Sequence, residues 1–260
     1  MDDLRGAASE ALRQLAWCVQ NDPCTALGTR THHGWDGRLV GYEWRGQGYA
    51  ETCDALAPIQ RMGSELAEMI TPGTRPRRTA APAARYAKLV FQWGRVRPRR
   101  WSPRAVVDVV GWAIRKASEP QFGFGAAWSK VGALATTHLE DCQGGRPHAI
   151  ADSRVTASLI LRLDAALAQR GGGEVRCVFP GLALMPRRGE RGELAKHKLC
   201  PTRPAFRRRW DTQTMVSRLV LCLRDILNGR ARLPRMPLPG GGCGAWTTRG
   251  VEMVLFMDGA

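Results

Sequence analysis

The sequence contains little lysine and comparatively few acidic residues, so arginine carries most of its charge. Of 39 basic residues only five are lysines, and 23 acidic residues leave a net charge of +16 over 260 residues. Such an excess repels itself unless a polyanion binds, which favours nucleic acid as partner and an anionic membrane surface as the alternative. Because arginine supplies the charge, each remaining lysine is a candidate for a role that needs its amine: Lys88, Lys116, Lys130, Lys196 and Lys198.

The sequence also lacks long apolar runs and clustered cysteines. No apolar run approaches the ~20 residues that span a bilayer, and Met1-Asp2-Asp3 does not open a secretory signal. We therefore expect a cytoplasmic, nucleoid-associated protein with no membrane partner. The eight cysteines include no CxxC pair, and reduced thiols are expected in the cytoplasm. Isolated pairs offer too few ligands for a metal, so we expect no metal and no cofactor: His138 with Cys142, and His197 with Cys200.

Apolar periodicity predicts a mostly α-helical fold of about eight helices with little strand. The predicted helices cover residues 3–20, 54–70, 83–93, 103–118, 127–140, 153–169, 212–228 and 248–257. Residues 21–53 have no sustained period and predict a loop with a short hairpin. The Pro- and Arg-rich segment 71–82 predicts a linker between an N-terminal helical region, 1–70, and a larger helical region, 83–260.

The most basic part of the chain is residues 69–107, which hold ten basic residues and no acidic one. Four arginines lie between two tryptophans: Trp93, Arg95, Arg97, Arg99, Arg100 and Trp101. Guanidinium groups bind phosphate and aromatic rings stack on bases, so this pattern indicates a nucleic-acid contact. A solvated basic face is the alternative interpretation.

Residues 121–155 carry the pattern that points to chemistry. A glycine turn, QFGFG, precedes a predicted helix with Lys130 near its start, and Asp152 is placed to begin the next helix 22 positions later. The partially positive N-terminus of a helix stabilises a carboxylate. An amine and a carboxylate that face one pocket can break an N-glycosidic bond. The amine attacks the sugar C1′ or activates water, while the carboxylate stabilises the oxocarbenium charge.

Two stretches of this segment, GFGAAWSKV and HAIADSRV, resemble the hairpin, lysine and aspartate of the helix-hairpin-helix DNA glycosylases, especially the 8-oxoguanine glycosylase branch. The C-terminal stretch WTTRGVEMVLFMDG resembles the ending of bacterial chains with the 8-oxoguanine glycosylase fold. The resemblance implies a helix-hairpin-helix glycosylase-like helical bundle. It further implies that Lys130 forms a Schiff base with the sugar, that Asp152 assists, and that Gly123 and Gly125 bind DNA phosphate through backbone N–H groups.

Other residues around the two catalytic candidates are predicted to contact DNA. Ser129 directly precedes Lys130, and Arg154 follows Asp152 by two positions, so both are candidates for binding the DNA strand. Phe122, Trp128 and Trp93 are candidates for stacking on a base that has been extruded from the duplex, as base-excision enzymes require. Packing in the core is the alternative for each ring.

Each chemical assignment has a structural alternative. Asp152 is equally interpretable as a plain helix N-cap, because aspartate is favoured there. Lys130 is interpretable as a surface or phosphate-binding lysine, and Arg154 as the partner of a phosphate or an acidic neighbour. His148 is interpretable as a structural histidine.

Three functions remain open from the sequence. The first is a DNA glycosylase, with or without lyase activity, that removes a modified base such as an oxidised purine in base excision repair of DNA damage. The second is a catalytically silent DNA-binding module of the same fold in repair or phage defence. The third is an RNA-associated basic protein. For the first two we expect a monomer that binds duplex DNA, and for the enzyme Lys130 and Asp152 within roughly 8 Å of each other.

Overall fold

The computed structural model describes residues 2–23, 31–70, 76–96, 98, 101–115, 117–142, 145–169, 174–182 and 210–259. Over these residues the chain folds into ten α-helices, one 3-10 helix and two short hairpins. The predicted mostly α-helical class with little strand is confirmed. None of the helices in the described part is long and apolar enough to cross a membrane.

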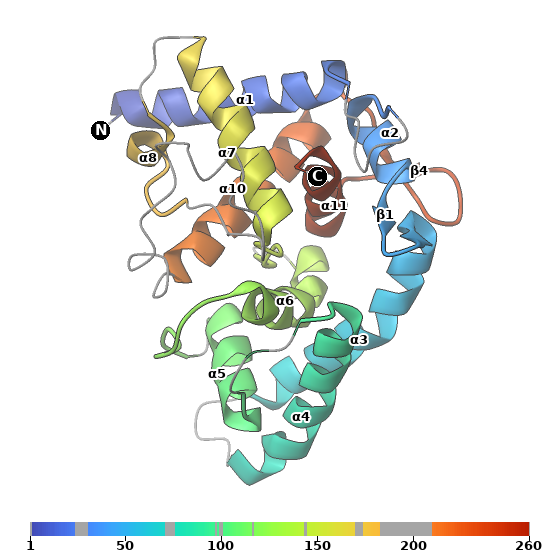
Figure 1. Cartoon of the computed structure of the whole chain (residues 1–260), viewed down its shortest axis with the longest axis vertical. Coiled ribbons are helices and arrows are strands. Elements are labelled where there is room, and N and C mark those ends of the chain that lie inside the picture. Colours follow the sequence, from blue (N-terminus) through green and yellow to red (C-terminus); the bar gives the residue numbers. More distant parts are fainter. Residues whose placement is uncertain are drawn as a thin grey trace.

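The N-terminal part of the chain contains three helices and one hairpin (Figure 1). These are α1 (Asp2–Asn21), α2 (Gly34–Val40), β1 (Glu43–Trp44), β2 (Gln47–Gly48) and α3 (Tyr49–Met69). The strands are antiparallel, with Glu43 opposite Gly48. The two turn residues, Arg45 and Gly46, have φ angles of 57° and 80°, as a tight two-residue hairpin turn requires. The hairpin predicted within residues 21–53 is therefore present, together with the unpredicted helix α2.

The remaining elements are mainly helical. The middle of the chain forms α4 (Pro76–Trp93), α5 (Pro103–Ala113), α6 (Ala126–Ala135) and the 3-10 helix η2 (Thr137–Asp141). The last part forms α7 (Ser153–Ala168), α8 (Val175–Val178), α10 (Trp210–Gly229), β3 (Met236–Pro237), β4 (Cys243–Gly244) and α11 (Thr248–Asp258).

Helix boundaries differ from the predicted ones where local backbone geometry intervenes. Helix α5 begins as expected, with the Ser102 hydroxyl accepting from the Ala105 N–H, but it ends at Ala113. Arg115 has a φ of 61°, which a right-handed helix cannot include. The predicted helix 127–140 is divided at Thr136 into α6 and η2.

The predicted linker 71–82 also differs, because α4 begins inside it at Pro76. A proline at the first position of a helix costs no hydrogen bond, since the first N–H groups have no partner within the helix. Thr79 is only 2% exposed, so this first part of α4 packs against the protein. A proline-rich composition thus marked a helix start here, and residues 76–82 extend the helix that was predicted for 83–93.

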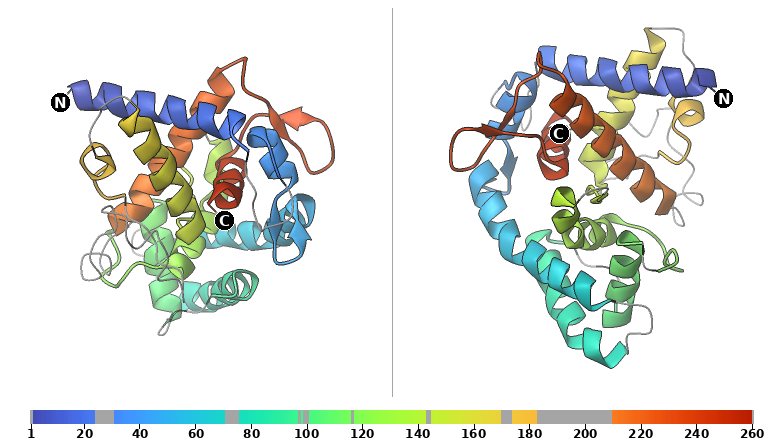
Figure 2. Two further views of the ribbon diagram at one scale, coloured as in Figure 1. Left: turned by 45° about the horizontal axis from the view of Figure 1, so that its top comes forward. Right: turned by 180° about the vertical axis from the view of Figure 1, so that it is seen from behind.

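The helices form two groups in space (Figures 1 and 2). One group contains α1, α2, α7, α8, α10 and α11, and the other contains α4, α5 and α6, while α3 runs beside the second group from the β1–β2 hairpin. The first helix therefore lies against α7 and α10, far along the chain. Apolar side chains of α1 such as Leu15 and Val19 are fully buried there. This grouping does not follow the boundary predicted at residues 71–82.

Within the first group of helices, a cluster of ion pairs links α2 and α7 to the end of α11. The Arg38 side chain is 0% exposed, with its Nη2 3.3 Å from the Asp258 carboxylate and its Nη1 2.5 Å from the Val19 carbonyl. Arg162 donates to the same carboxylate at 2.8 Å and pairs with Asp22. Burial by itself would raise the pKa of Asp258. The hydrogen bonds and charge of Arg162 outweigh that effect and hold the pKa below its ordinary value.

We expect Asp258→Asn to lower the free energy of unfolding at pH 7 by about 3–5 kcal/mol, because it leaves buried Arg38 without its counter-charge. A carboxylate whose folded-state pKa is depressed stabilises the fold above its unfolded pKa. That stabilisation is lost as the pH falls through the folded-state value. The deficit of Asp258→Asn should therefore shrink below about pH 4.

Urea unfolding between pH 3 and pH 7 measures this difference. Asp108→Asn is the matched control, since Asp108 pairs with Arg104 on the exposed face of α5 and such pairs contribute little. Equal stability of Asp258→Asn and the unaltered protein at pH 7 would contradict the assignment.

Candidate functional site

Helices α6 and α7 bring the two predicted catalytic side chains together. The Lys130 Nζ lies 3.9 Å from the Asp152 Oδ2, closer than the roughly 8 Å expected. The side chains are 6% and 14% exposed, respectively. An amine and a carboxylate thus form a largely buried ion pair at the start of α7.

Asp152 divides its two carboxylate oxygens between structure and the ion pair. Its Oδ1 accepts hydrogen bonds from the backbone N–H groups of Arg154 and Val155, each at 3.0 Å. Its Oδ2 is the oxygen that faces Lys130. The N-cap interpretation of Asp152 is confirmed, and it does not compete with a chemical role because a different oxygen serves each.

The end of α4 covers the Lys130 side chain. The Nζ lies 5.9 Å from the centroid of the Trp93 ring, a distance suited to a cation–π contact. A Cβ added at Gly94 would lie 2.7 Å from the Lys130 Cδ, so the chain passes this lysine where glycine has no side chain. Trp93, predicted as a stacking ring, therefore packs beside the catalytic candidate.

Glu252 of α11 is a charged neighbour of this pair that sequence reasoning missed. It is 6% exposed, its Oε2 accepts from the Ile150 N–H at 2.6 Å, and it pairs with Arg249. Burial raises the pKa of Glu252, against the lowering effects of Arg249 and the Ile150 N–H. The Asp152 charge raises this pKa further. Glu252 lies within the C-terminal stretch WTTRGVEMVLFMDG, whose resemblance to other chains implies only a fold and no role for this residue.

Side chains from other elements hold the segment that leads into Asp152. Four consecutive backbone N–H groups donate to them: His148 to Thr136 Oγ1 (2.8 Å), Ala149 to Ser217 Oγ (3.2 Å), Ile150 to Glu252 Oε2 (2.6 Å) and Ala151 to Ser129 Oγ (2.7 Å). This arrangement fixes the start of α7 relative to α6, α10 and α11.

Ser129 has an internal role in place of the predicted DNA contact. It is 1% exposed, and its hydroxyl accepts from the Ala151 N–H and donates to the Gln213 Oε1 at 2.5 Å. Gln213 in turn donates to the Ala149 carbonyl at 2.6 Å. The Ser129 hydroxyl therefore makes its hydrogen bonds within the protein, where it supports the segment that leads into Asp152.

His148 fits the structural interpretation. Its Nδ1 is 3.2 Å from the Ser217 hydroxyl, and its ring lies 4.9 Å from that of Trp112. Burial, with a smaller contribution from Arg115, lowers the pKa of His148 to about 4. The imidazole is therefore neutral at pH 7 and packs, half-buried, beside Trp112 and Ser217.

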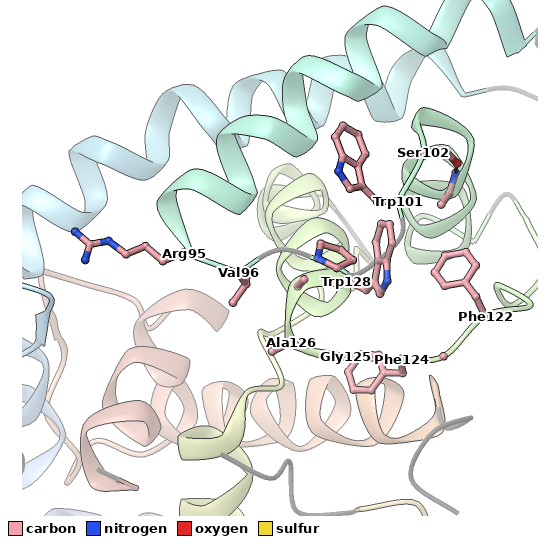
Figure 3. Close-up of a pocket in the computed structure, with 13 residues that line it drawn as sticks. Arg95, Val96, Trp101, Ser102, Phe122, Phe124, Gly125, Ala126 and Trp128 are labelled. Carbon is pink, nitrogen blue, oxygen red and sulfur yellow. Dashed lines mark hydrogen bonds between the residues drawn. The ribbon is translucent and has the colours of Figure 1, made fainter. Parts of the chain in front are cut away.

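The glycine turn lines a cavity of about 800 Å³ (Figure 3). Several predicted DNA-binding and stacking residues gather around it: Arg95, Phe122, Gly123, Gly125 and Trp128. Helix α6 begins here at Ala126, after the N-cap residue Gly125, which has no side chain to cap it. The first N–H groups of a helix suit an anion, which agrees with the phosphate contact that the resemblance implies for this turn.

The cavity and the ion pair lie on different sides of α6. Neither Lys130 nor Asp152 is among the residues that line the cavity, and neither is Trp93. Residues two apart on a helix project about 200° from each other, and Trp128 lines the cavity while Lys130 faces Asp152. The structure therefore separates the predicted site residues into two places.

Arg154 is a further predicted DNA contact that the structure describes. The Arg154 guanidinium lies over the Phe256 ring at 4.5 Å. Arg45, which the sequence analysis did not single out, lies over the ring of Trp44, and burial together with the charge of Arg95 lowers the pKa of Arg45. The other predicted arginines, Arg97, Arg99 and Arg100, lie outside the described residues.

Metal ligands do not cluster in the part of the chain that the structure describes. No group of three or more His, Cys, Asp or Glu side chains there could hold a metal ion. In the pair considered from sequence, the Cys142 thiol lies 3.5 Å from the His138 backbone carbonyl. The pair His197 and Cys200 falls outside the described residues.

Comparisons with protein-family models, curated proteins and solved structures found no match to this chain. Membership of the helix-hairpin-helix glycosylases therefore stays a prediction. It rests on the sequence resemblance of residues 121–155 and of the C-terminal stretch.

We expect Ser129→Ala to lower the free energy of unfolding by about 1–3 kcal/mol, because it leaves the buried Ala151 N–H without its acceptor. Urea unfolding followed by circular dichroism measures the loss. Ser64→Ala is the matched control, since that hydroxyl donates only to the Gln60 carbonyl of its own helix. A loss no larger than that of Ser64→Ala would show that the Ser129 bridge contributes nothing.

Proposed function

We propose that this protein is a DNA glycosylase-like enzyme that cleaves the N-glycosidic bond of a modified base, with oxidised purines as the first candidates. The observation that carries the proposal is the 3.9 Å approach of the Lys130 Nζ to the Asp152 Oδ2. The sequence resemblance implies these same two residues. An amine beside a carboxylate is the combination that this reaction needs.

In the proposed reaction the neutral amine of Lys130 attacks C1′ of the nucleotide. The C1′–N bond breaks, and its electron pair leaves with the base, which takes up a proton. While it is ionised, Asp152 would stabilise the positive charge that develops on the sugar. Once the C1′–Nζ bond has formed, the Asp152 Oδ2 is positioned to take the proton that the nitrogen must lose. Opening of the sugar ring, with that proton passing to O4′, then gives a Schiff base between Lys130 and C1′.

Rigid support favours this pair as a reacting site. Asp152 Oδ1 is held by two backbone N–H groups, so Oδ2 keeps a fixed direction. Burial of both side chains keeps water from the pair, and electrostatic interactions are stronger in such a setting. The duplex would be bound by phosphate contacts from Arg95 and the glycine turn, consistent with a net charge of +16.

A catalytically silent DNA-binding module of the same kind is the second candidate. The observation that favours it is the cover over Lys130, whose side chain is only 6% exposed beneath Trp93 and Gly94. A sugar reaches the amine only if this cover moves when DNA binds. The two candidates differ in turnover and agree in DNA binding.

We expect borohydride to trap a covalent complex between the protein and duplex DNA that carries 8-oxoguanine or an abasic site. Lys130→Gln should abolish the adduct while changing DNA affinity by no more than a few fold, because only the nucleophile is removed. Asp152→Asn should slow base release by about 10²-fold or more, the scale seen when a charge-stabilising group is lost. Gel mobility of the adduct and release of the base are the measurements.

Lys88→Gln is the matched control, since Lys88 is an exposed lysine of α4, and its loss should leave the adduct intact when the protein is present at saturating concentration. An adduct that persists in Lys130→Gln would assign the chemistry to another amine. Tight binding without an adduct or base release on any modified duplex would favour the silent module.

We expect duplex binding to weaken steeply with salt, and Arg95→Ala to reduce the slope of log K against log salt by about one, as loss of one phosphate contact does. Fluorescence anisotropy at several salt concentrations gives the slope. Arg104→Ala is the control, because Arg104 is exposed and paired with Asp108. A near-zero slope for the unaltered protein would remove the nucleic-acid interpretation.

A further inference from the structure

Two cavities meet at Arg95, Val96 and Trp101, which follow α4 and line both. The first cavity, of about 800 Å³, is also lined by the glycine turn. The second, of about 590 Å³, is also lined by side chains of α4. Both fall within the roughly 300–1,000 Å³ of small-molecule pockets, and Trp101 forms a wall that they share.

Aromatic rings line the first cavity. Trp128 packs against Phe122 with ring centroids 5.0 Å apart, and Trp101 and Trp128 each pack edge-on against Phe91. In Figure 3 the rings of Trp101, Trp128 and Phe122 gather on one side of the cavity, and Arg95 reaches out in the opposite direction. Trp101 and Phe122 stay partly exposed, so flat surfaces remain available to a ligand.

Basic side chains line the second cavity. Arg85 and Lys88 are exposed on α4, and Arg95 follows at its end. None of the described residues that line either cavity is acidic. Rings for planar groups thus lie beside cations for phosphates, which is the combination found in grooves that bind single-stranded nucleic acid.

We infer that these two cavities form a binding groove for unpaired nucleotides of a DNA strand, with a base against Trp101 and Phe122 and the backbone phosphates along Arg95, Lys88 and Arg85. Bases stacked within a duplex cannot enter such a recess, because their faces are covered by neighbouring pairs. The groove therefore selects DNA with an unpaired segment.

This groove is a second nucleotide site, distinct from the ion pair. Lys130 projects from α6 away from the cavity that Trp128 lines, so a base in the groove is not the base that reacts. The inference adds to the proposed function by naming the substrate class, a modified base near unpaired DNA. Binding of the unpaired strand itself needs no chemistry at Lys130.

Fluorescence anisotropy with a ten-nucleotide thymidine strand and with a fully paired duplex of equal length tests the groove. We expect the unpaired strand to bind about ten-fold more tightly than the duplex. Trp101→Ala should weaken binding of the strand by roughly ten-fold, the effect of losing one stacked base, while Trp101→Phe should keep it within about three-fold. Trp17→Ala is the matched control, because Trp17 is also half-buried but lies on α1.

A 2-aminopurine in the strand gives a second measurement that does not depend on affinity. Its fluorescence should fall on binding to the unaltered protein and to Lys130→Gln, and should stay high with Trp101→Ala at saturating protein. Equal quenching by Trp101→Ala and Trp17→Ala would overturn the inference. So would tighter binding of the matched RNA strand, which would assign the groove to RNA.

The outcomes separate this inference from the glycosylase proposal. Loss of stacking in Trp101→Ala, with no borohydride adduct on any DNA, would leave the groove standing and remove the enzyme. An adduct at Lys130 together with Trp101-independent strand binding would leave the enzyme standing and remove the groove.

Discussion

Residues 148–151 connect the two groups of helices, and their backbone N–H groups have no helix of their own in which to bond. A buried N–H without a partner is costly, so each must find an acceptor. Here the acceptors are side chains of Thr136, Ser217, Glu252 and Ser129. The position of α7 relative to α6, α10 and α11 depends on these bonds, and so does everything that α7 carries at its first residue.

The charge arrangement around Asp152 follows from this constraint. Glu252 serves as the acceptor for Ile150 and is buried with Arg249, so a second carboxylate lies close enough to Asp152 for the Asp152 charge to raise the pKa of Glu252. Two carboxylates near each other need cations, and Lys130 and Arg249 supply them. Lys130 therefore belongs to a largely buried cluster of two cations and two carboxylates.

Helix α6 is short and buried along most of its length, and small residues make this possible. Every residue from Ala127 to Ala135 is buried. A Cβ added at Gly63 of α3 would lie only 2.8 Å from the Ala135 Cα, so the two helices cross with backbones in close approach. Since α6 is enclosed in this way, its two faces look onto two separate environments. One is the ion pair, and the other is the aromatic cavity beside the glycine turn.

The sequence by itself determined the features that depend on neighbours three or four residues away. Helical periodicity, the Ser102-Pro103 start of α5, the capping role of Asp152 and the tight hairpin within residues 21–53 all express local geometry. For the same reason it marked Lys130 and Asp152 as candidates, since both follow local signals at helix starts. The sequence did not predict that α5 ends at Ala113 and α6 at Ala135, because local backbone conformation and not apolar periodicity decides where a helix ends.

Only the tertiary structure decided what those residues meet. The 3.9 Å approach of Lys130 to Asp152 spans 22 positions, and the bond from Ile150 to Glu252 spans 102. The inward role of Ser129, the place of Glu252 and the separation of Trp128 from Lys130 depend on which helices pack together. Such packing is set by the burial of apolar faces over the whole chain, and no window of a few residues contains that information.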